Sequence, residues 1–287
     1  MNPPARLPLW RTAVLTAIAM LAFAANSILC RLALEHGAID PASFTLIRIA
    51  SGVAALWLIL AVSGTVRCVG GSWRAGLALF VYAAAFSYAY ISLSAAAGAL
   101  LLFGAVQATM VTIGLARGER LASLQWLGFA AALVGLAALL APGVSAPSLS
   151  GAVLMLAAGA AWGAYSLLGR GATNPLAATA GNFLRSLPMA AALIAIAALP
   201  GLKLDGAGIA YAILSGAVAS GLGYSIWYAA LPGLTPAQGA SVQLSVPVIT
   251  AIAGALLIGE PITQRLVICS IAILGGIALV IGSKPKV

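Results

Sequence analysis

Apolar runs long enough to cross a bilayer follow one another along almost the whole chain. A transmembrane helix needs about 20 residues to cross the ~30 Å hydrocarbon core of a membrane. Runs of that kind cover residues 11–34, 42–63, 73–93, 95–115, 121–140, 150–169, 175–199, 207–230, 236–258 and 262–282. The sequence therefore predicts an all-α membrane protein with ten transmembrane helices.

Charged residues are too few to cover a surface that faces water. They make up 7% of the 287 residues and apolar residues make up 63%, whereas a typical soluble domain has about 25% charged residues. The short alternating segments of a transmembrane β-barrel do not fit this pattern either. Lipid must therefore surround most of the molecule, and we expect a multi-pass protein of a bacterial inner membrane.

The basic residues are concentrated in one set of loops. With ten spans, both termini lie on one side of the membrane, and the loops of that side carry Arg6, Arg11, Arg67, Arg74, Arg117, Arg120, Arg170, Lys284 and Lys286. The opposite loops carry Lys203 and Arg265, with Arg31 at the end of the first span. Because cytoplasmic loops are enriched in Lys and Arg, we predict that both termini are cytoplasmic. These basic residues are scattered singly, so no nucleic-acid partner is expected.

The two halves of the chain repeat one another. At an offset of 141 residues, Gly98 aligns with Gly239 and Glu119 aligns with Glu260. Two arginine pairs align nearer the start of each half, at offsets of 139 and 137: Arg31 with Arg170, and Arg48 with Arg185. We therefore predict one five-helix repeat over residues 1–141 and a second over 149–287. Because five is odd, the second repeat enters the membrane from the opposite face, as in the inverted repeats of secondary transporters.

A family pattern is visible in the second half, over residues 228–279. Small residues follow a turn, a proline lies in the penultimate helix, a Gly-Glu pair ends that helix, and the last helix is rich in glycine. The residues that carry this pattern are Pro247, Glu260, Gly275 and Gly276. The pattern resembles the repeat of the EamA family, within the drug/metabolite transporter (DMT) superfamily. In the first half Glu119 matches it, but Val106 stands where Pro247 would predict a proline.

Among EamA proteins, the chain most resembles the YddG-type exporters of aromatic amino acids. That closer resemblance rests on overall similarity and on the aromatic residues of the third, sixth and eighth spans. It implies ten helices, export from the cytoplasm and no covalent chemistry. It does not fix the substrate, because relatives carry very different metabolites.

Acidic residues are missing from the middle of every predicted span. All five lie at helix ends or in loops: Glu35, Asp40, Glu119, Asp205 and Glu260. Proton-driven exporters of lipophilic cations typically bury a carboxylate for which cation and proton compete, so a multidrug-cation antiporter is disfavoured. The chain also has no metal cluster, nucleophile elbow or phosphate-binding loop. We therefore predict no enzyme, no metal and no cofactor.

Two arginines lie inside the predicted spans. Arg185 is about ten residues into its span, and Arg48 is some seven residues into the second span, nearer the outer surface. Arg185 has two interpretations: it attracts a substrate carboxylate in a central cavity, or it braces helices by binding backbone carbonyls. Its repeat partner Arg48 favours a shared architectural role.

Polar and aromatic residues gather on particular helix faces at similar depth. The candidates for substrate binding are Asn26, Tyr82, Tyr90, Gln107, Trp162, Tyr165, Arg185, Tyr224, Trp227 and Gln243. Any single aromatic residue could instead face lipid or pack between helices. Several tyrosine hydroxyls at mid-depth need partners that hydrocarbon does not offer. A chamber lined by such groups suits a neutral or zwitterionic solute such as an amino acid.

Three further residues are candidates for gating or structural roles. Pro247 removes a backbone hydrogen bond in mid-span and is either a hinge or a static bend. Glu119 and Glu260 end their helices, where the macrodipole disfavours an anion. We expect these two carboxylates to form ion pairs with nearby basic residues such as Arg120 or Arg265, and these pairs to hold the helix ends together on one face of the protein.

Together these features predict a secondary transporter or facilitator that exports small metabolites by alternating access around a central cavity. Amino acids with aromatic or other large apolar side chains are the expected substrates. The alternatives are an exporter of another metabolite or drug, and a channel-like pore, which would need a continuous polar lining. Passive facilitation and proton coupling both fit. The expected partners are the small-molecule substrate and the lipid bilayer, without an obligate protein partner.

Overall fold

The computed structural model describes residues 8–64, 70–118, 120–143, 146–169, 172–197, 201–234, 239 and 242–282. Its helices in the first half are α1 (Leu9–Glu35), α2 (Pro41–Val62), α3 (Trp73–Ala89), α4 (Ala95–Ala116) and α5 (Ser123–Leu140). The second half has α6 (Leu149–Leu168), α7 (Pro175–Ala197), a composite eighth helix, α11 (Ser245–Leu257) and α12 (Gln264–Gly282). The prediction of an all-helical chain is thus confirmed for the described residues.

The eighth helix is not a regular α-helix along its whole length. It begins as α8 (Gly206–Ile213), continues as the π-helix η2 (Leu214–Leu222), returns to α-helix in α9 (Gly223–Ala230) and ends in the 3₁₀ turn η3 (Leu231–Gly233). The whole segment Gly206–Gly233 is one of eight among the described residues that are long and apolar enough to cross a membrane. The other two predicted spans correspond to α3 and α11, which have 17 and 13 helical residues.

Several helices begin where the sequence supplies a capping side chain. Asp40 precedes Pro41, and its carboxylate accepts a hydrogen bond from the backbone nitrogen of Ser43 at 2.9 Å. Ser72, Ser94 and Ser148 cap α3, α4 and α6 in the same way. Each cap satisfies an amide that the first helical turn leaves without a partner. The cap at Ser94 separates α4 from α3 although the two apolar runs are almost continuous in the sequence.

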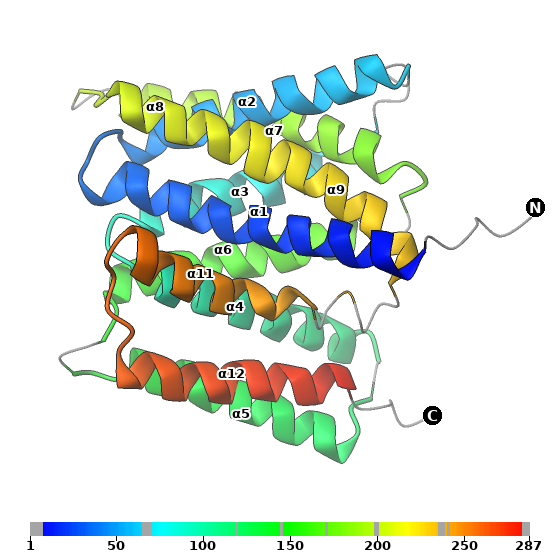
Figure 1. Cartoon of the computed structure of the whole chain (residues 1–287), viewed down its shortest axis with the longest axis vertical. Coiled ribbons are helices and arrows are strands. Elements are labelled where there is room, and N and C mark those ends of the chain that lie inside the picture. Colours follow the sequence, from blue (N-terminus) through cyan, green and yellow to red (C-terminus); the bar gives the residue numbers. More distant parts are fainter. Residues whose placement is uncertain are drawn as a thin grey trace, which may run out of the picture.

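The helices pack side by side in one bundle (Figure 1). α5 and α12 form an outer pair, α2 lies against α7, and α4 lies against α11. α3 and α4 both pack on α6, while α1 packs on α9, η2 and α11. The first turn of α1 and the last turn of α12 lie at the same end of the bundle (Figure 1).

Glycines let some of these helices touch through their backbones. A Cβ atom added to Gly276 of α12 would collide with the carbonyl oxygen of Gly128 in α5, and one added to Gly128 would collide with that of Gly276. In η2, a Cβ on Gly216 would meet the carbonyl oxygen of Arg48 in α2. Close approach at small residues is the usual basis of helix association in membranes.

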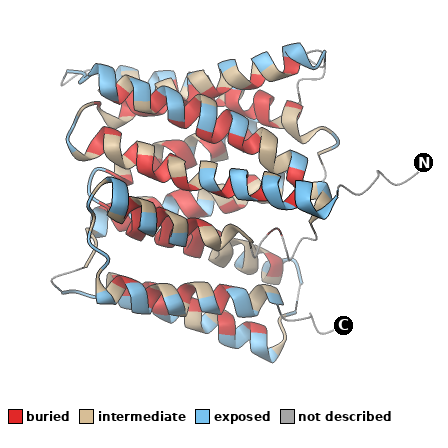
Figure 2. Cartoon of the chain, in the orientation of Figure 1, coloured by how far each residue is buried: buried red, intermediate tan, exposed pale blue. Residues whose placement is uncertain are grey.

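The burial pattern matches a molecule whose outer surface faces hydrocarbon. Buried residues fill the interior of the bundle, and exposed residues cover its periphery (Figure 2). Many exposed residues are large and apolar, including Leu256 at 79%, Ile271 at 70% and Val134 at 67% exposure. A monomeric soluble protein rarely exposes apolar surface on this scale.

Candidate functional site

A small cavity lies in the middle of the bundle. It is lined from α1, α3, α4, α6, η2, α9 and the segment before α11 by Phe23, Asn26, Ser27, Tyr82, Phe86, Leu102, Phe103, Trp162, Ala219, Ser220, Tyr224 and Gln243. Its volume is about 30 Å³, and a water molecule needs roughly 10–15 Å³ on the same measure. In this conformation the cavity therefore has room for very few water molecules and none for an amino acid.

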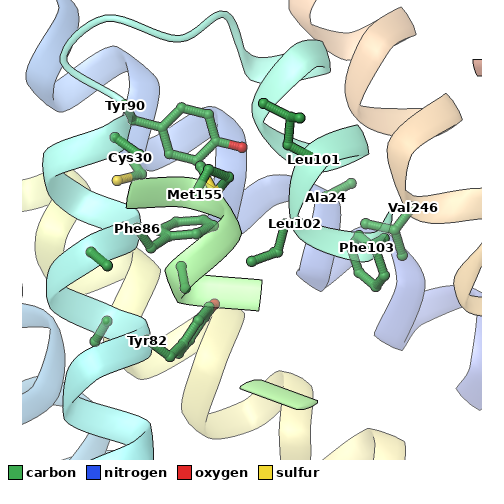
Figure 3. Close-up of a cluster of buried hydrophobic side chains, with 14 of the residues drawn as sticks. Ala24, Cys30, Tyr82, Phe86, Tyr90, Leu101, Leu102, Phe103, Met155 and Val246 are labelled. Carbon is green, nitrogen blue, oxygen red and sulfur yellow. The ribbon is translucent and has the colours of Figure 1, made fainter. Parts of the chain in front are cut away.

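Aromatic rings form one wall of the cavity. Trp162 of α6 lies at its centre, with ring centroids 4.8 Å from Tyr82 and 5.3 Å from Tyr224. Phe86 lies one turn along α3, 5.4 Å from Tyr82. In Figure 3, Tyr82, Phe86 and Tyr90 follow one another along α3 and point to the same side. The stripe that the sequence showed in the third span is buried between helices, so these rings do not face lipid.

A polar network runs behind this wall and joins four helices. Asn26 of α1 accepts a hydrogen bond from Ser215 Oγ of η2 at 2.6 Å. The Asn26 amide donates to the Tyr82 hydroxyl of α3 at 3.3 Å. Arg48 of α2 donates to the same hydroxyl, through Nη2, at 2.9 Å. The Tyr82 hydroxyl thus links the cavity wall to a buried guanidinium.

Arg48 is a buried residue at this site that the predicted binding residues did not include. It is 2% exposed, and its guanidinium carbon lies 5.1 Å and 5.0 Å from the ring centroids of Tyr82 and Phe86. Its Nη1 is buried and has no hydrogen-bond partner. Within the described ranges, the ion pairs join Arg31 to Glu35 and Glu260, and neither involves Arg48.

Arg185 has a different environment, although it aligns with Arg48 in the sequence. Its Nη1 donates to the carbonyl oxygens of Gly70 at 2.7 Å and Gly181 at 2.9 Å. It thereby joins α7 to the segment that leads into α3, and it does not line the central cavity. Of the two interpretations of Arg185, these contacts correspond to the structural brace.

We expect Arg185→Lys and Arg185→Ala to lower the melting temperature of the purified protein without changing its substrate selectivity. Each hydrogen bond from a charged group to a carbonyl contributes about 1.5–3 kcal/mol, and lysine lacks the geometry to reach both oxygens. Thermal unfolding in detergent and a competition profile with amino-acid analogues would measure the two effects. A variant with normal stability and altered substrate selectivity would contradict the brace and indicate that Arg185 contacts the substrate.

The predicted binding residues divide into two equal groups. The cavity is lined by Asn26, Tyr82, Trp162, Tyr224 and Gln243, but not by Tyr90, Gln107, Tyr165, Arg185 and Trp227. Tyr90 and Tyr165 are buried beside lining residues, and their rings pack on Phe86 and Trp162 at 4.8 Å and 5.3 Å. Trp227 packs on Phe23 at 6.1 Å.

Gln107 lies elsewhere in the bundle. It lines a smaller cavity between α4, α5 and α12, together with apolar residues such as Phe129 and Leu136. Phe23, Leu102 and Phe103 line the central cavity and were not predicted. For Phe23 the signal was available, since Asn26 and Ser27 follow it at the i+3 and i+4 spacing of one helix face.

Pro247 lies just after an interruption of the helix, a turn at Leu244 that follows the helical residues Val242 and Gln243. It is the third residue of α11, in the first turn, where a missing amide removes no intrahelical hydrogen bond. Its role as a hinge or a static bend stays a prediction. Another stretch of irregular backbone in the described part of the second half is η2.

Glu260 pairs with a residue that the sequence did not suggest. Its Oε1 accepts from Arg31 Nε at 2.9 Å, and its Oε2 accepts from the backbone nitrogen of Ala95 at 2.8 Å. Arg31 also binds Glu35 at 2.7 Å. The expected partner Arg265 instead donates to the carbonyl oxygen of Ala138. This cluster, here called the Arg31–Glu260 cluster, joins α1, the start of α4 and the segment after α11.

Glu119 lies outside the described residues, so its pairing is not assigned. Over the part of the chain that the structure describes, no group of three His, Cys, Asp or Glu side chains is placed to hold a metal ion.

Comparison with known proteins points to one family. The model of the EamA-like transporter family matches residues 149–282. An uncharacterized protein of Pseudomonas aeruginosa is 59% identical over 279 residues, which cover 97% of each chain. A solved crystal structure superposes with a TM-score of 0.67 over 93% of this chain and 95% of the other, at 22% identity. At that identity the likeness concerns the fold alone.

Proposed function

Because the chain belongs to the EamA-like transporter family, we propose that it is a secondary transporter or facilitator that exports amino acids from the cytoplasm across a bacterial inner membrane. The substrates are amino acids with aromatic or other large apolar side chains. The observation that carries this proposal is the central cavity, where aromatic rings and a few polar groups converge and no lining residue among those described is charged.

The packing of the helices supports two inverted repeats, over residues 1–141 and 149–287. In the proposed inverted repeat, a twofold axis in the membrane plane would relate α2 to α7, α4 to α11 and α5 to α12, and each of these pairs is in contact. Under the same axis, α3 would correspond to the eighth helix and α6 to α1. The contact of α3 with α6 would then correspond to the contact of the eighth helix with α1, and both contacts are present. The cavity lies between the two units, as expected for alternating access by rocking of one repeat against the other.

The position of the chain ends supports a common side for both termini. α1 begins and α12 finishes at the same end of the bundle (Figure 1). Arg74 and Arg117 belong to that end as well, at the start of α3 and the end of α4. The excess of basic residues there makes it the cytoplasmic end.

The chemistry of the cavity supports a large apolar side chain in the substrate. A substrate ring could stack among Tyr82, Trp162 and Tyr224, and each aromatic pair contributes about 0.5–1.5 kcal/mol beyond burial. Because the cavity is small here, this conformation is a closed one, and the substrate enters after the rings and helices around it separate.

Cells that overproduce the protein should tolerate toxic analogues of phenylalanine or tryptophan better than control cells. Trp162→Ala should remove most of this advantage, because Trp162 contacts both Tyr82 and Tyr224 in the cavity wall. Trp73→Ala is the matched control: Trp73 begins α3 and is 60% exposed. Growth in graded analogue concentrations, at equal protein abundance, measures the effect.

Protection against lipophilic cationic dyes, with none against amino-acid analogues, would overturn this assignment. Counterflow in proteoliposomes separates a transporter from a channel-like pore. A transporter accumulates labelled phenylalanine against its gradient when the vesicles are preloaded with unlabelled phenylalanine, and a pore does not.

A further inference from the structure

Arg48 is a buried cation that has no counter-charge among the described residues. Its guanidinium rests on the faces of Tyr82 and Phe86, and such cation–π contacts offset part of the cost of burying a charge. Its Nη2 donates a hydrogen bond to the Tyr82 hydroxyl. Nη1 keeps unused donor capacity in a place that water does not reach. A buried charge left in this way is expensive unless something else compensates for it.

The central cavity lies next to Arg48, across two aromatic rings. Tyr82 and Phe86, the two residues under the guanidinium, both line the cavity. Ser220 also lines it, and the Ser220 hydroxyl is likewise buried without a hydrogen-bond partner. As the cavity enlarges to admit a substrate, a shift of the Tyr82 ring brings Nη1 into contact with the contents of the cavity.

The charge at this site selects the sign of the ligand. Arg48 contributes a full positive charge, and the ion pairs of the described residues lie at Arg31, away from it. A ligand carboxylate would neutralise the guanidinium and match its planar pair of donors. A ligand ammonium would find no carboxylate among the described lining residues and would be repelled by Arg48.

We propose that Arg48 is the carboxylate-binding residue of the cavity and that the amino group of the substrate is dispensable. The substrate class is then wider than amino acids: it comprises monocarboxylates that carry a large apolar group. In the bound state the carboxylate accepts from Nη1 of Arg48 and from the Ser220 hydroxyl, and the apolar group lies among Tyr82, Trp162 and Tyr224. This inference rests on the proposed function, since it takes the cavity to be the substrate site.

Four probes that share one phenyl group test the inference on the unmodified protein. They are 3-phenylpropanoate, phenylalanine, 3-phenylpropanamide and phenethylamine, titrated calorimetrically into the purified full chain. We expect 3-phenylpropanoate to bind at least as tightly as phenylalanine. The amide and the amine should bind at least about tenfold more weakly, because both lack the carboxylate, and a hydrogen bond between charged groups changes an affinity by at least about tenfold.

Variants assign the effect to Arg48. Arg48→Gln should weaken 3-phenylpropanoate binding by at least about tenfold and leave the weak binding of the amide unchanged. Arg48→Lys should recover only part of the affinity, because lysine keeps the charge but not the planar fork. Arg265→Gln is the matched control: Arg265 binds a backbone carbonyl at the end of α5, far from the cavity lining.

The outcomes separate this inference from the proposed function. If the amide binds the unmodified protein as tightly as 3-phenylpropanoate, the inference is wrong while the proposed function stands. The same holds if a folded Arg48→Gln protein binds 3-phenylpropanoate normally, or if phenylalanine binds and 3-phenylpropanoate does not. Binding of none of the four probes would overturn the proposed function and the inference with it. Should the Arg48 variants fail to fold, the probe series on the unmodified protein decides alone.

Discussion

Replacing Gly276 with valine should prevent α12 from docking on α5 and leave little folded protein. A Cβ at this position collides with the carbonyl oxygen of Gly128 and approaches the backbone nitrogen of Ala132 at 2.8 Å. Backbone atoms in a helix cannot move aside as a flexible side chain can, so the helices must separate. Overpacking of this kind costs about 1–3 kcal/mol or more. Size-exclusion profiles of a fluorescent fusion in detergent would measure the loss.

The neighbouring glycine provides the control. A Cβ added to Gly275 meets no atom within 4 Å, so Gly275→Val has the same effect on helix propensity without the collision. We expect Gly275→Val to give a profile close to that of the unmodified protein. Equal losses of folded protein in both variants would mean that the effect comes from helix propensity and not from the collision between α12 and α5.

Replacing Glu260 with alanine should also have a large effect, because it breaks the Arg31–Glu260 cluster. The Glu260 side chain is 9% exposed, and its two oxygens bind Arg31 and the first amide of α4. Removing one partner of a buried ion pair costs about 3–5 kcal/mol when the other charge is left alone. Here Arg31 keeps its pair with Glu35, but the amide of Ala95 loses its acceptor. We expect a lower melting temperature and a looser contact between the two halves of the chain.

Glu35→Ala removes a carboxylate from the same arginine and serves as the control. The Glu35 side chain is 25% exposed and pairs with Arg31 within one helix, four residues away. Pairs of this kind contribute roughly 0–1 kcal/mol. Melting temperatures of the two variants, measured side by side, should therefore differ clearly. A Glu35→Ala protein as unstable as Glu260→Ala would show that the connection between the two halves is not what stabilises the cluster.

The helices could be predicted from the sequence because hydrocarbon thickness dictates their length. Each predicted apolar run overlaps one observed helix, or the composite eighth helix, and capping residues such as Asp40 and Ser94 mark where two of them begin. The π-helix η2 could not be predicted, since its residues are ordinary small and apolar ones. Its hydrogen bonding depends on packing against α1 and α2, which no local pattern reports.

The site was less predictable, because helix rotation decides which residues meet. Residues at similar depth, such as Gln107 and Gln243, lie in different cavities since their helices present different faces. Ion pairing was predicted between neighbours in the sequence, but Glu260 pairs with Arg31, 229 positions away. Counting from the helix end gives the depth of Arg48 along its span, but it could not show that the side chain lies against two aromatic rings.

The π-helix in the eighth span also bears on how the two halves diverged. An extra residue in an α-helix rotates everything after it by about 100°, whereas a π turn absorbs the extra residue in a wider loop of backbone. Between Arg48 and Gly98 the chain advances 50 positions, and between the aligned Arg185 and Gly239 it advances 54. If the proposed repeats descend from one duplicated ancestor, insertions entered this half after the duplication. The π-helix at Leu214–Leu222 would accommodate one inserted residue without rotating the helix after it, so that Tyr224 still lines the cavity.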